Sequence, residues 1–410
     1  MSDRLSLVVL GLSITSSWGN GHATTYRALV REITARGHDV LFLERDQPWY
    51  AENRDMPVPP HGRTVVYRSL DELRDGFTSH IRHADAVILG SYVPDGIAIG
   101  DWLAAEARGT TAFYDIDTPV TLAALQQGTC DYLAPRQIAA FDLYLSFTGG
   151  PTLTRLEQEF GSPAARALYC SFDPELYYPE GAADVRWDLG YLGTYSDDRQ
   201  PTLDRLLLDP ARQWREGRFI VAGPQYPASI RWPANVEREI HISPAHHRTF
   251  YTAQRFTLNV TRAAMVRAGW SPSVRLFEAA ACGVPIISDQ WPGLEEFLVP
   301  GREIFVSRTA ADTLALVQTL PEEARLAAAE RARRRVTSTH TAAHRAAELE
   351  RFLFNVRDRP RRLTGGARGA ATPRGAGTPP GAGTLRGAGT IRGAGTLRGA
   401  GTSVPADSDV

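Results

Sequence analysis

The sequence SPSVRLFEAAACGVPIISD, residues 271–289, decides the fold. It predicts an apolar helix that leads directly into a buried strand. Ser271 suits the N-cap of this helix, and Pro272 suits its first position, where a missing N–H costs nothing. Gly283 suits the helix end. A helix that passes straight into a buried strand is typical of α/β proteins with a parallel sheet.

Two charges interrupt this apolar helix. Arg275 and Glu278 lie three residues apart on one face, and buried charges need partners. The helix start offers free N–H groups and partial positive charge, which suit a phosphate. The residues that would bind such a ligand here are Ser271, Ser273, Val274 and the adjoining Asp289. An arginine beside a phosphate and a glutamate one turn deeper can bind a diphosphate and a sugar hydroxyl, which predicts a nucleotide-sugar site. The alternative is that Arg275 and Glu278 form an ion pair with each other and bind no ligand.

Strands and helices alternate on both sides of the turn-rich segment at 179–184. Before it we expect strands at 5–12, 40–43, 86–89, 111–114, 143–147 and 167–170. After it we expect strands at 188–193, 219–223, 256–260, 284–288 and 303–306, and a helix at 200–208. The first strand, the helix with apolar residues from Tyr26 to Ile33 and the second strand form a unit of the Rossmann type.

This alternation predicts an α/β fold of two Rossmann-like parallel-sheet domains that face each other across a cleft. The predicted parts are 1–178, 185–335, a C-terminal helix at 336–356 and a tail at 363–410. In the tail, hexads of the type RGAGTP repeat from Arg374, and each holds at most one Leu or Ile. Such repeats bury too little to offset backbone entropy, so we expect the tail to be disordered.

Composition excludes several classes of chemistry. The 410 residues include 45 basic residues, all of them arginine, so lysine Schiff bases and a P-loop lysine are excluded. The net charge of −1 favours neither nucleic acid nor an anionic membrane. The cysteines Cys130, Cys170 and Cys282 form no C-x-x-C pair, so we expect no metal site. No apolar run is long enough for a membrane span or a signal segment, and we expect a cytoplasmic location.

A glycine-rich loop, SSWGNGH at 16–22, follows the first strand. Gly19 and Gly21 allow the backbone to approach a ligand closely. His22 could reach into the cleft as a base, or it could simply cap or pack locally. A dinucleotide fingerprint would need a third glycine where Thr24 stands, so a dehydrogenase is disfavoured.

Two carboxylates, Asp115 and Asp117, follow a buried strand, and ligands lie outside such strand ends. We expect at most one of them to face the cleft, where it would orient an acceptor hydroxyl or take its proton. Helix capping is the alternative role.

Strand ends in the second half supply further donor-binding candidates. Gly193, Thr194 and Arg199 follow the first strand there, and their N–H groups and charge suit a phosphate. His241 and Ile242 would hold the nucleotide base, and Arg262 would contact the diphosphate. A metal site among His241, His246 and His247 is disfavoured, since no other ligand supports it.

With these residues in hand, the chain resembles the CgeB-like (spore-maturation type) glycosyltransferases of the GT-B fold over most of residues 5–355. The motifs that carry the resemblance are SSWGNGHATTYRAL, DIDTP, FDLYLSFTGG, YLGTYSDDRQ, LNVTR and SPSVRLFEAAACGVPIISDQWPGL. The resemblance implies a donor on the C-terminal domain, an acceptor on the N-terminal domain and C-terminal helices that cross back to the first domain. It also implies that Glu278 takes the ribose hydroxyls. Many retaining relatives carry a second Glu eight positions earlier, where this chain has Trp270.

We therefore expect a metal-independent glycosyltransferase that needs no cofactor and moves a sugar from a nucleoside-diphosphate-sugar to an unknown acceptor hydroxyl. His22, Asp117 or Asp115 would supply the catalytic base. The alternatives are a nucleotide-sugar epimerase on the same fold and a catalytically silent nucleotide-sugar-binding protein.

Overall fold

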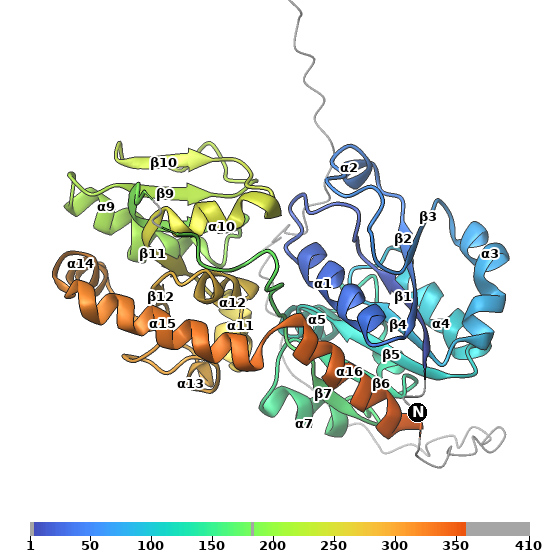
Figure 1. The fold of residues 1–410 in the computed structure, drawn as a ribbon. Helices are drawn as coiled ribbons and strands as arrows, with labels where there is room; N and C mark the ends of the chain where they lie inside the picture. Colours follow the sequence, from blue (N-terminus) through green and yellow to red (C-terminus); the bar gives the residue numbers. More distant parts are fainter. Residues whose placement is uncertain (1–3, 182–183, 358–410) are drawn as a thin grey trace, which may run out of the picture. The chain divides into compact units, whose positions relative to one another are not determined.

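Two parallel sheets with helices on both faces form the framework of the protein (Figure 1). The computed structural model describes residues 4–181 and 184–357, which belong to one compact unit. The prediction of an α/β fold with two parallel sheets is thereby confirmed. The predicted tail at 363–410 lies outside the described residues.

The first sheet has the strand order β3-β2-β1-β4-β5-β6-β7, and all its neighbours run parallel. Its strands are β1 (Ser6–Gly11), β2 (Asp39–Arg45), β3 (Arg63–Tyr67), β4 (Ala86–Gly90), β5 (Thr110–Asp115), β6 (Leu143–Ser146) and β7 (Ala165–Ala167). Its helices are α1 (His22–Ala35), α2 (Pro48–Ala51), α3 (Leu70–His83), α4 (Gly96–Glu106), α5 (Thr118–Gln127), α6 (Pro135–Ile138) and α7 (Pro151–Gln158). The central strands β1 and β4 are almost fully buried, as their continuous apolar runs require.

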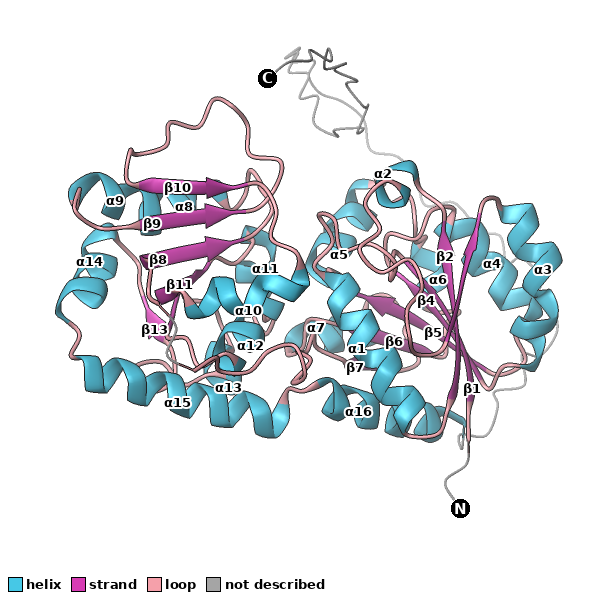
Figure 2. Cartoon of the chain, turned by 45° about the horizontal axis from the view of Figure 1, so that its top comes forward, coloured by secondary structure: helices cyan, strands magenta, loops and turns pink. Residues whose placement is uncertain are grey.

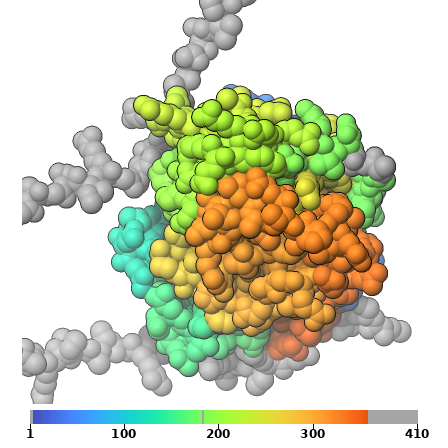
Figure 3. Space-filling model, turned by 90° about the vertical axis from the view of Figure 1, so that its left-hand side faces the viewer, coloured from blue at the N-terminus to red at the C-terminus, as the bar shows by residue number. Residues whose placement is uncertain are grey.

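The second sheet has the order β10-β9-β8-β11-β12-β13 (Figure 2). Its strands are β8 (Trp187–Leu192), β9 (Phe219–Ala222), β10 (Val236–Glu239), β11 (Gln254–Asn259), β12 (Ile286–Ser288) and β13 (Phe305–Val306). The helices here are α8 (Gln200–Leu203), the π-helical η1 (Asp204–Leu208), α9 (Asp209–Gln213), α10 (Pro244–Thr252), α11 (Ala263–Ala268), α12 (Val274–Ala281), α13 (Leu294–Phe297), α14 (Ala310–Thr319) and α15 (Glu322–Thr339). Figure 3 looks onto this half, where the orange side chains of α14 and α15 cover much of the surface.

Three expected boundaries are corrected. The decisive helix begins at Val274 with Ser273 at its N-cap, two residues later than expected. The hydroxyl of Ser271 instead lies 2.8 Å from that of Thr148, in the other half of the chain. The helix expected at 200–208 is α8 followed by η1, and the strand expected at 167–170 is β7, which ends at Ala167.

The chain crosses between the two halves twice, and the crossings lie side by side. The last helix, α16 (Ala342–Arg357), packs against α1 and β5 of the first half. Its start is tied to the segment that leaves the first sheet, because Ala342 N donates to Phe172 O at 3.0 Å. A buried apolar cluster that includes Tyr177, Phe277 and Leu349 joins both halves to these crossings.

Candidate functional site

A cavity of about 630 Å³ lies between the two halves. It is lined by the loops that follow β1, β5 and β6 of the first sheet and β8, β9, β10 and β11 of the second. These loops come after the carboxyl ends of parallel strands, the edge at which such sheets bind ligands. The arrangement therefore has the concave, two-sided form of a small-molecule site.

The start of α12 opens into this cavity. Ser271, Ser273, Val274 and Arg275 all line it. The Ser273 hydroxyl donates to Asn259 Oδ1 at 2.7 Å, which fixes the first turn against the end of β11. The first N–H groups of a helix have no partner within the helix, so an anion in the cavity would meet them.

Arg275 is held in place by uncharged groups. Its Nε donates to Leu192 O at 2.5 Å, its Nη1 donates to Asn259 Oδ1 at 3.0 Å, and its guanidinium lies 4.7 Å from the centre of the Tyr191 ring. No ion pair joins it to any carboxylate within residues 4–181 and 184–357. Arg275 and Glu278 thus do not form an ion pair with each other, and a buried positive charge faces the cavity without a carboxylate to neutralise it.

Glu278 lies one turn deeper and is 3% exposed. Its carboxylate accepts a hydrogen bond from Tyr251 at 3.2 Å, and His247 Nδ1 lies 3.8 Å away. The carboxylate still lines the cavity, so it keeps acceptor capacity for a hydroxyl group.

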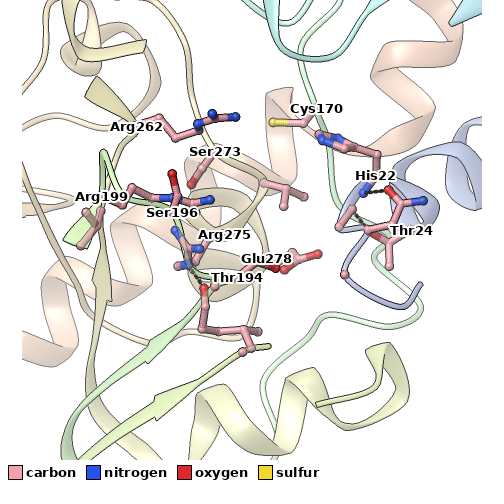
Figure 4. A pocket seen from close by; sticks show the side chains of 18 of the residues that line it. His22, Thr24, Cys170, Thr194, Ser196, Arg199, Arg262, Ser273, Arg275 and Glu278 are labelled. Atoms are coloured by element: carbon pink, nitrogen blue, oxygen red, sulfur yellow. Dashed lines mark hydrogen bonds between the residues drawn. The ribbon is translucent and has the colours of Figure 1, made fainter. Parts of the chain in front are cut away.

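Two more arginines face the same space (Figure 4). Arg262 lies 3.6 Å from Asp117 in the first half and 3.6 Å from Asp198 in the second. Arg199 Nη1 lies 3.5 Å from the Tyr191 hydroxyl. In the described part of the chain, the Nε atoms of both arginines are buried without a hydrogen-bond partner. Gly193 and Thr194 line the cavity beside them, so hydrogen-bond donors converge in one part of it, an arrangement that suits an anion.

The first half contributes His22 at the start of α1, together with Gly19, Gly21 and Asp117. Asn20 Oδ1 accepts from His22 N at 3.1 Å and fixes the turn into the helix. Burial lowers the pKa of the His22 imidazole, while Asp117 raises it and Arg262 lowers it further. Figure 4 places this imidazole across the cavity from the arginines. A neutral imidazole at that position is able to accept a proton.

Asp115 lies outside the cavity lining, although the sequence placed it among the catalytic candidates. Its carboxylate is fully buried and accepts from Tyr144 at 2.5 Å and from Thr121 at 2.8 Å. Burial raises its pKa to about 6, against the lowering effect of these hydrogen bonds. β5 ends at Asp115, and the turn that follows carries Asp117 to the cavity instead.

Asp289 also lies outside the lining, although it was expected to bind the donor. It accepts from Thr261 N and Thr261 Oγ1, the latter at 2.9 Å, and so ties the end of β12 to the end of β11. Neither Asp115 nor Asp289 therefore lies in the candidate site.

The expected base-binding residues, His241 and Ile242, line the cavity on the second half. The Trp18 ring from the first half lies 4.8 Å from the His241 ring. Other lining residues did not stand out as site residues in the sequence, above all His247, Tyr251 and Cys170. The three histidines close together in the sequence indicated His247 as a candidate, whereas no local sequence pattern indicated Tyr251. Burial raises the pKa of Cys170 to about 12, so its thiol is protonated at neutral pH.

Trp270 stands where retaining relatives carry a second glutamate, and its side chain does not line the cavity. Its ring lies against Gly150 of the first half and Gly293 of the second, where any side-chain carbon would collide with it. Its Nε1 donates to Glu296 at 2.6 Å. This position therefore joins the two halves and brings no carboxylate to the cavity.

In the described ranges, none of the helices has the length and apolar character needed to cross a membrane.

Comparison with known proteins agrees with this geometry. Residues 199–351 match a family described as glycosyl transferase-like. No curated protein matches the sequence. Among solved structures, sucrose-phosphate synthase from Thermosynechococcus elongatus superposes with a TM-score of 0.65 at 15% identity, covering 86% of this chain and 99% of that chain. HepE from Anabaena in complex with UDP-glucose has a TM-score of 0.63 at 13% identity, covering 86% and 100%. An alpha-glucosyltransferase in complex with UDP and a 13-mer DNA has a TM-score of 0.63 at 10% identity, covering 86% and 100%. The chain therefore has the GT-B fold of these glycosyltransferases, and its residues 199–351 match a glycosyl transferase-like family.

Proposed function

We propose that this chain is a CgeB-like glycosyltransferase that moves a sugar from a nucleoside-diphosphate-sugar to an acceptor hydroxyl without a metal ion. One observation carries the proposal: the open start of α12 and three arginines lie in one cavity, opposite a half-buried histidine. The solved complexes of HepE and the alpha-glucosyltransferase contain UDP, so a uridine-diphosphate sugar is the first donor to test.

The donor would lie along the second half of the chain. The N–H groups at the start of α12, with Arg275, Arg199 and Arg262, would bind the diphosphate. Negative charge grows on the leaving diphosphate as the glycosidic bond breaks, and fixed positive charge stabilises it most in the transition state. The arginine side chains would here supply the positive charge that a divalent cation supplies in other transferases. Glu278 would accept hydrogen bonds from the ribose hydroxyls, as the family resemblance implies.

The acceptor would approach from the first half. His22 would take the proton of the acceptor hydroxyl as that oxygen attacks the sugar, and its lowered pKa keeps the imidazole neutral for this role. Asp117 lines the same wall and would stabilise the imidazolium that forms. In this proposal the nucleophile is the acceptor oxygen itself, so the protein forms no covalent intermediate.

A ligand screen tests the donor half of the proposal. We expect one of the uridine, thymidine, guanosine and cytidine diphosphates, uridine diphosphate first, to raise the melting temperature through selective binding. We expect the shift to persist in EDTA. Loss of the shift in EDTA would contradict metal independence, and no shift with any nucleotide would contradict a nucleotide-sugar site.

Incubation with the matching sugar nucleotide tests the reaction itself. We expect transfer of the sugar to a hydroxyl acceptor and release of the diphosphate. An isomerised sugar with donor alone would identify an epimerase instead, and tight binding without transfer to any acceptor would identify a silent binding protein.

A further inference from the structure

A histidine on α10, with its side chain 14% exposed, connects two groups that line the second half's side of the cavity. His247 Nε2 lies 3.1 Å from Ile242 O, in the loop between β10 and α10. Its Nδ1 lies 3.0 Å from the Tyr177 hydroxyl and 3.8 Å from Glu278 Oε2. One imidazole therefore touches the backbone expected to meet the base and lies beside the carboxylate expected to meet the ribose.

These partners fix the tautomer of His247. A carbonyl oxygen only accepts hydrogen bonds, so Nε2 must carry the hydrogen and donate to Ile242 O. In a neutral imidazole, Nδ1 then accepts, and the Tyr177 hydroxyl at 3.0 Å is placed to donate to it. Burial lowers the pKa of His247, against the raising effect of Glu278 and with further lowering by Arg275 and His246, so the neutral form dominates at neutral pH.

Tyr177 belongs to the crossing between the two halves and not to either sheet. Its backbone N–H donates to Asp173 O at 2.9 Å, and the Asp173 carboxylate pairs with Arg31 of α1 at 2.7 Å. The phenol is buried among residues of the apolar cluster that joins both halves. The hydroxyl that orients His247 is therefore held by the first half, although the histidine belongs to the second.

We propose that His247 is a positioning residue for the nucleoside half of the donor, with the Ile242 carbonyl fixing its tautomer and Tyr177 holding its Nδ1 from the interdomain crossing. The inference rests on the proposed function and adds a residue that fixes the backbone of Ile242 and packs beside Glu278. The cavity then has two parts. The arginines at one end bind the diphosphate, and His247 at the other end positions the groups that bind the base and the ribose.

The two parts are distinguished by two probes, uridine diphosphate and inorganic pyrophosphate, titrated by calorimetry into the full-length protein. We expect His247→Leu to weaken uridine diphosphate binding by about tenfold, since a partly buried hydrogen bond is lost and Ile242 O is left without this partner. Pyrophosphate binding should be unchanged. His247→Gln places an amide nitrogen near the position of Nε2 and should restore most of the nucleotide affinity. Tyr177→Phe should show a smaller loss, again confined to the nucleotide.

The matched control is His246→Leu, because His246 is exposed on the same helix and, among residues 4–181 and 184–357, its side chain is hydrogen-bonded to its neighbour Ser243 at 2.8 Å and to no other residue. This variant should bind both probes like the wild type. If His247→Leu binds uridine diphosphate as tightly as the wild type, this inference is wrong, while the proposed function is unaffected. Equal loss of both probes, without rescue by His247→Gln, would also overturn it by indicating general damage to the fold. If the wild type binds pyrophosphate but no nucleotide of the panel, the proposed function falls and the inference falls with it.

Discussion

Arg275 brings a positive charge into the cavity without a carboxylate to neutralise it. We expect Arg275→Ala to lower kcat/KM by about 2–4 kcal/mol of transition-state stabilisation, or roughly 30- to 1,000-fold, because the charge meets the leaving diphosphate. Arg275→Lys should not be a mild change. Lysine cannot donate to Leu192 O and Asn259 Oδ1 from a planar fork and still face a phosphate.

Steady-state kinetics and nucleotide titration check this prediction. Arg267→Ala is the matched control, since Arg267 is exposed on α11 and lies outside the cavity lining. It should leave both measurements unchanged. Unaltered nucleotide affinity and turnover in Arg275→Ala would show that the start of α12 is not where the diphosphate binds.

The pH dependence of transfer reports on His22. Burial holds the pKa of this imidazole below its ordinary value of 6.5, so the neutral base persists to lower pH and the acidic limb of kcat/KM should lie below 6.5. Asp117 raises this pKa, so Asp117→Asn should move the limb to lower pH. Arg262 lowers it, so Arg262→Gln should move the limb to higher pH. Profiles of kcat/KM at fixed ionic strength test both directions, and shifts of the same sign in both variants would exclude His22 as the titrating base.

At the scale of elements, the cavity depends on how closely the loops after β8 and β9 approach each other. Gly223 has a φ of +144°, and a Cβ there would lie 2.1 Å from Gly193 O. We expect Gly223→Ala to destabilise the protein by at least about 1–3 kcal/mol and to weaken nucleotide binding, because the loop carrying Gly193 and Thr194 must move.

Gly76→Ala is the opposite case and serves as the control. Gly76 lies inside α3, and a Cβ there meets nothing within 4 Å. Alanine is the better helix former, so this variant should be more stable by about 0.5–1 kcal/mol with unchanged nucleotide affinity. Chemical denaturation measures both variants, and a neutral Gly223→Ala would mean that the two loops tolerate separation.

The strands at the centre of the first sheet were predicted because they are buried throughout. β1 and β4 are continuous apolar runs, β5 is buried along its whole length, and residues after β1 and β5 line the cavity. β3 was missed because it is an edge strand, only half buried, and its sequence RTVVY holds just three consecutive apolar residues. The choice between Asp115 and Asp117 depends on where β5 ends, which composition does not specify. The Tyr177–His247 contact joins residues 70 positions apart, and no local pattern marks such a pair.

At the scale of the whole molecule, the two halves share their interior. α16 returns from the second half to α1, its Glu350 lies 3.1 Å from His38 Nε2, and its Leu349 belongs to the same buried cluster as Phe277 of α12. The segments that cross between the halves are hydrogen-bonded to each other at Phe172 and Ala342. Nucleotide bound to the second half should therefore stabilise the first half as well.

Calorimetry of a core variant tests this coupling. Leu349 is 2% exposed, and Leu349→Ala should destabilise the protein by about 2–5 kcal/mol by leaving a cavity under α16. Leu326→Ala is the matched control, because Leu326 on α15 is 50% exposed and its loss should change the stability by no more than about 0.5 kcal/mol.

We expect one unfolding transition in each protein. Its midpoint should fall in Leu349→Ala and rise with uridine diphosphate, which should add about 2.7 kcal/mol of stability at a hundredfold excess over Kd. Nucleotide affinity below the transition should not change, since Leu349 does not line the cavity. Two separate transitions, of which the substitution moves one and the nucleotide moves the other, would show that the halves are stable independently and that α16 covers the first half without coupling it to the donor site.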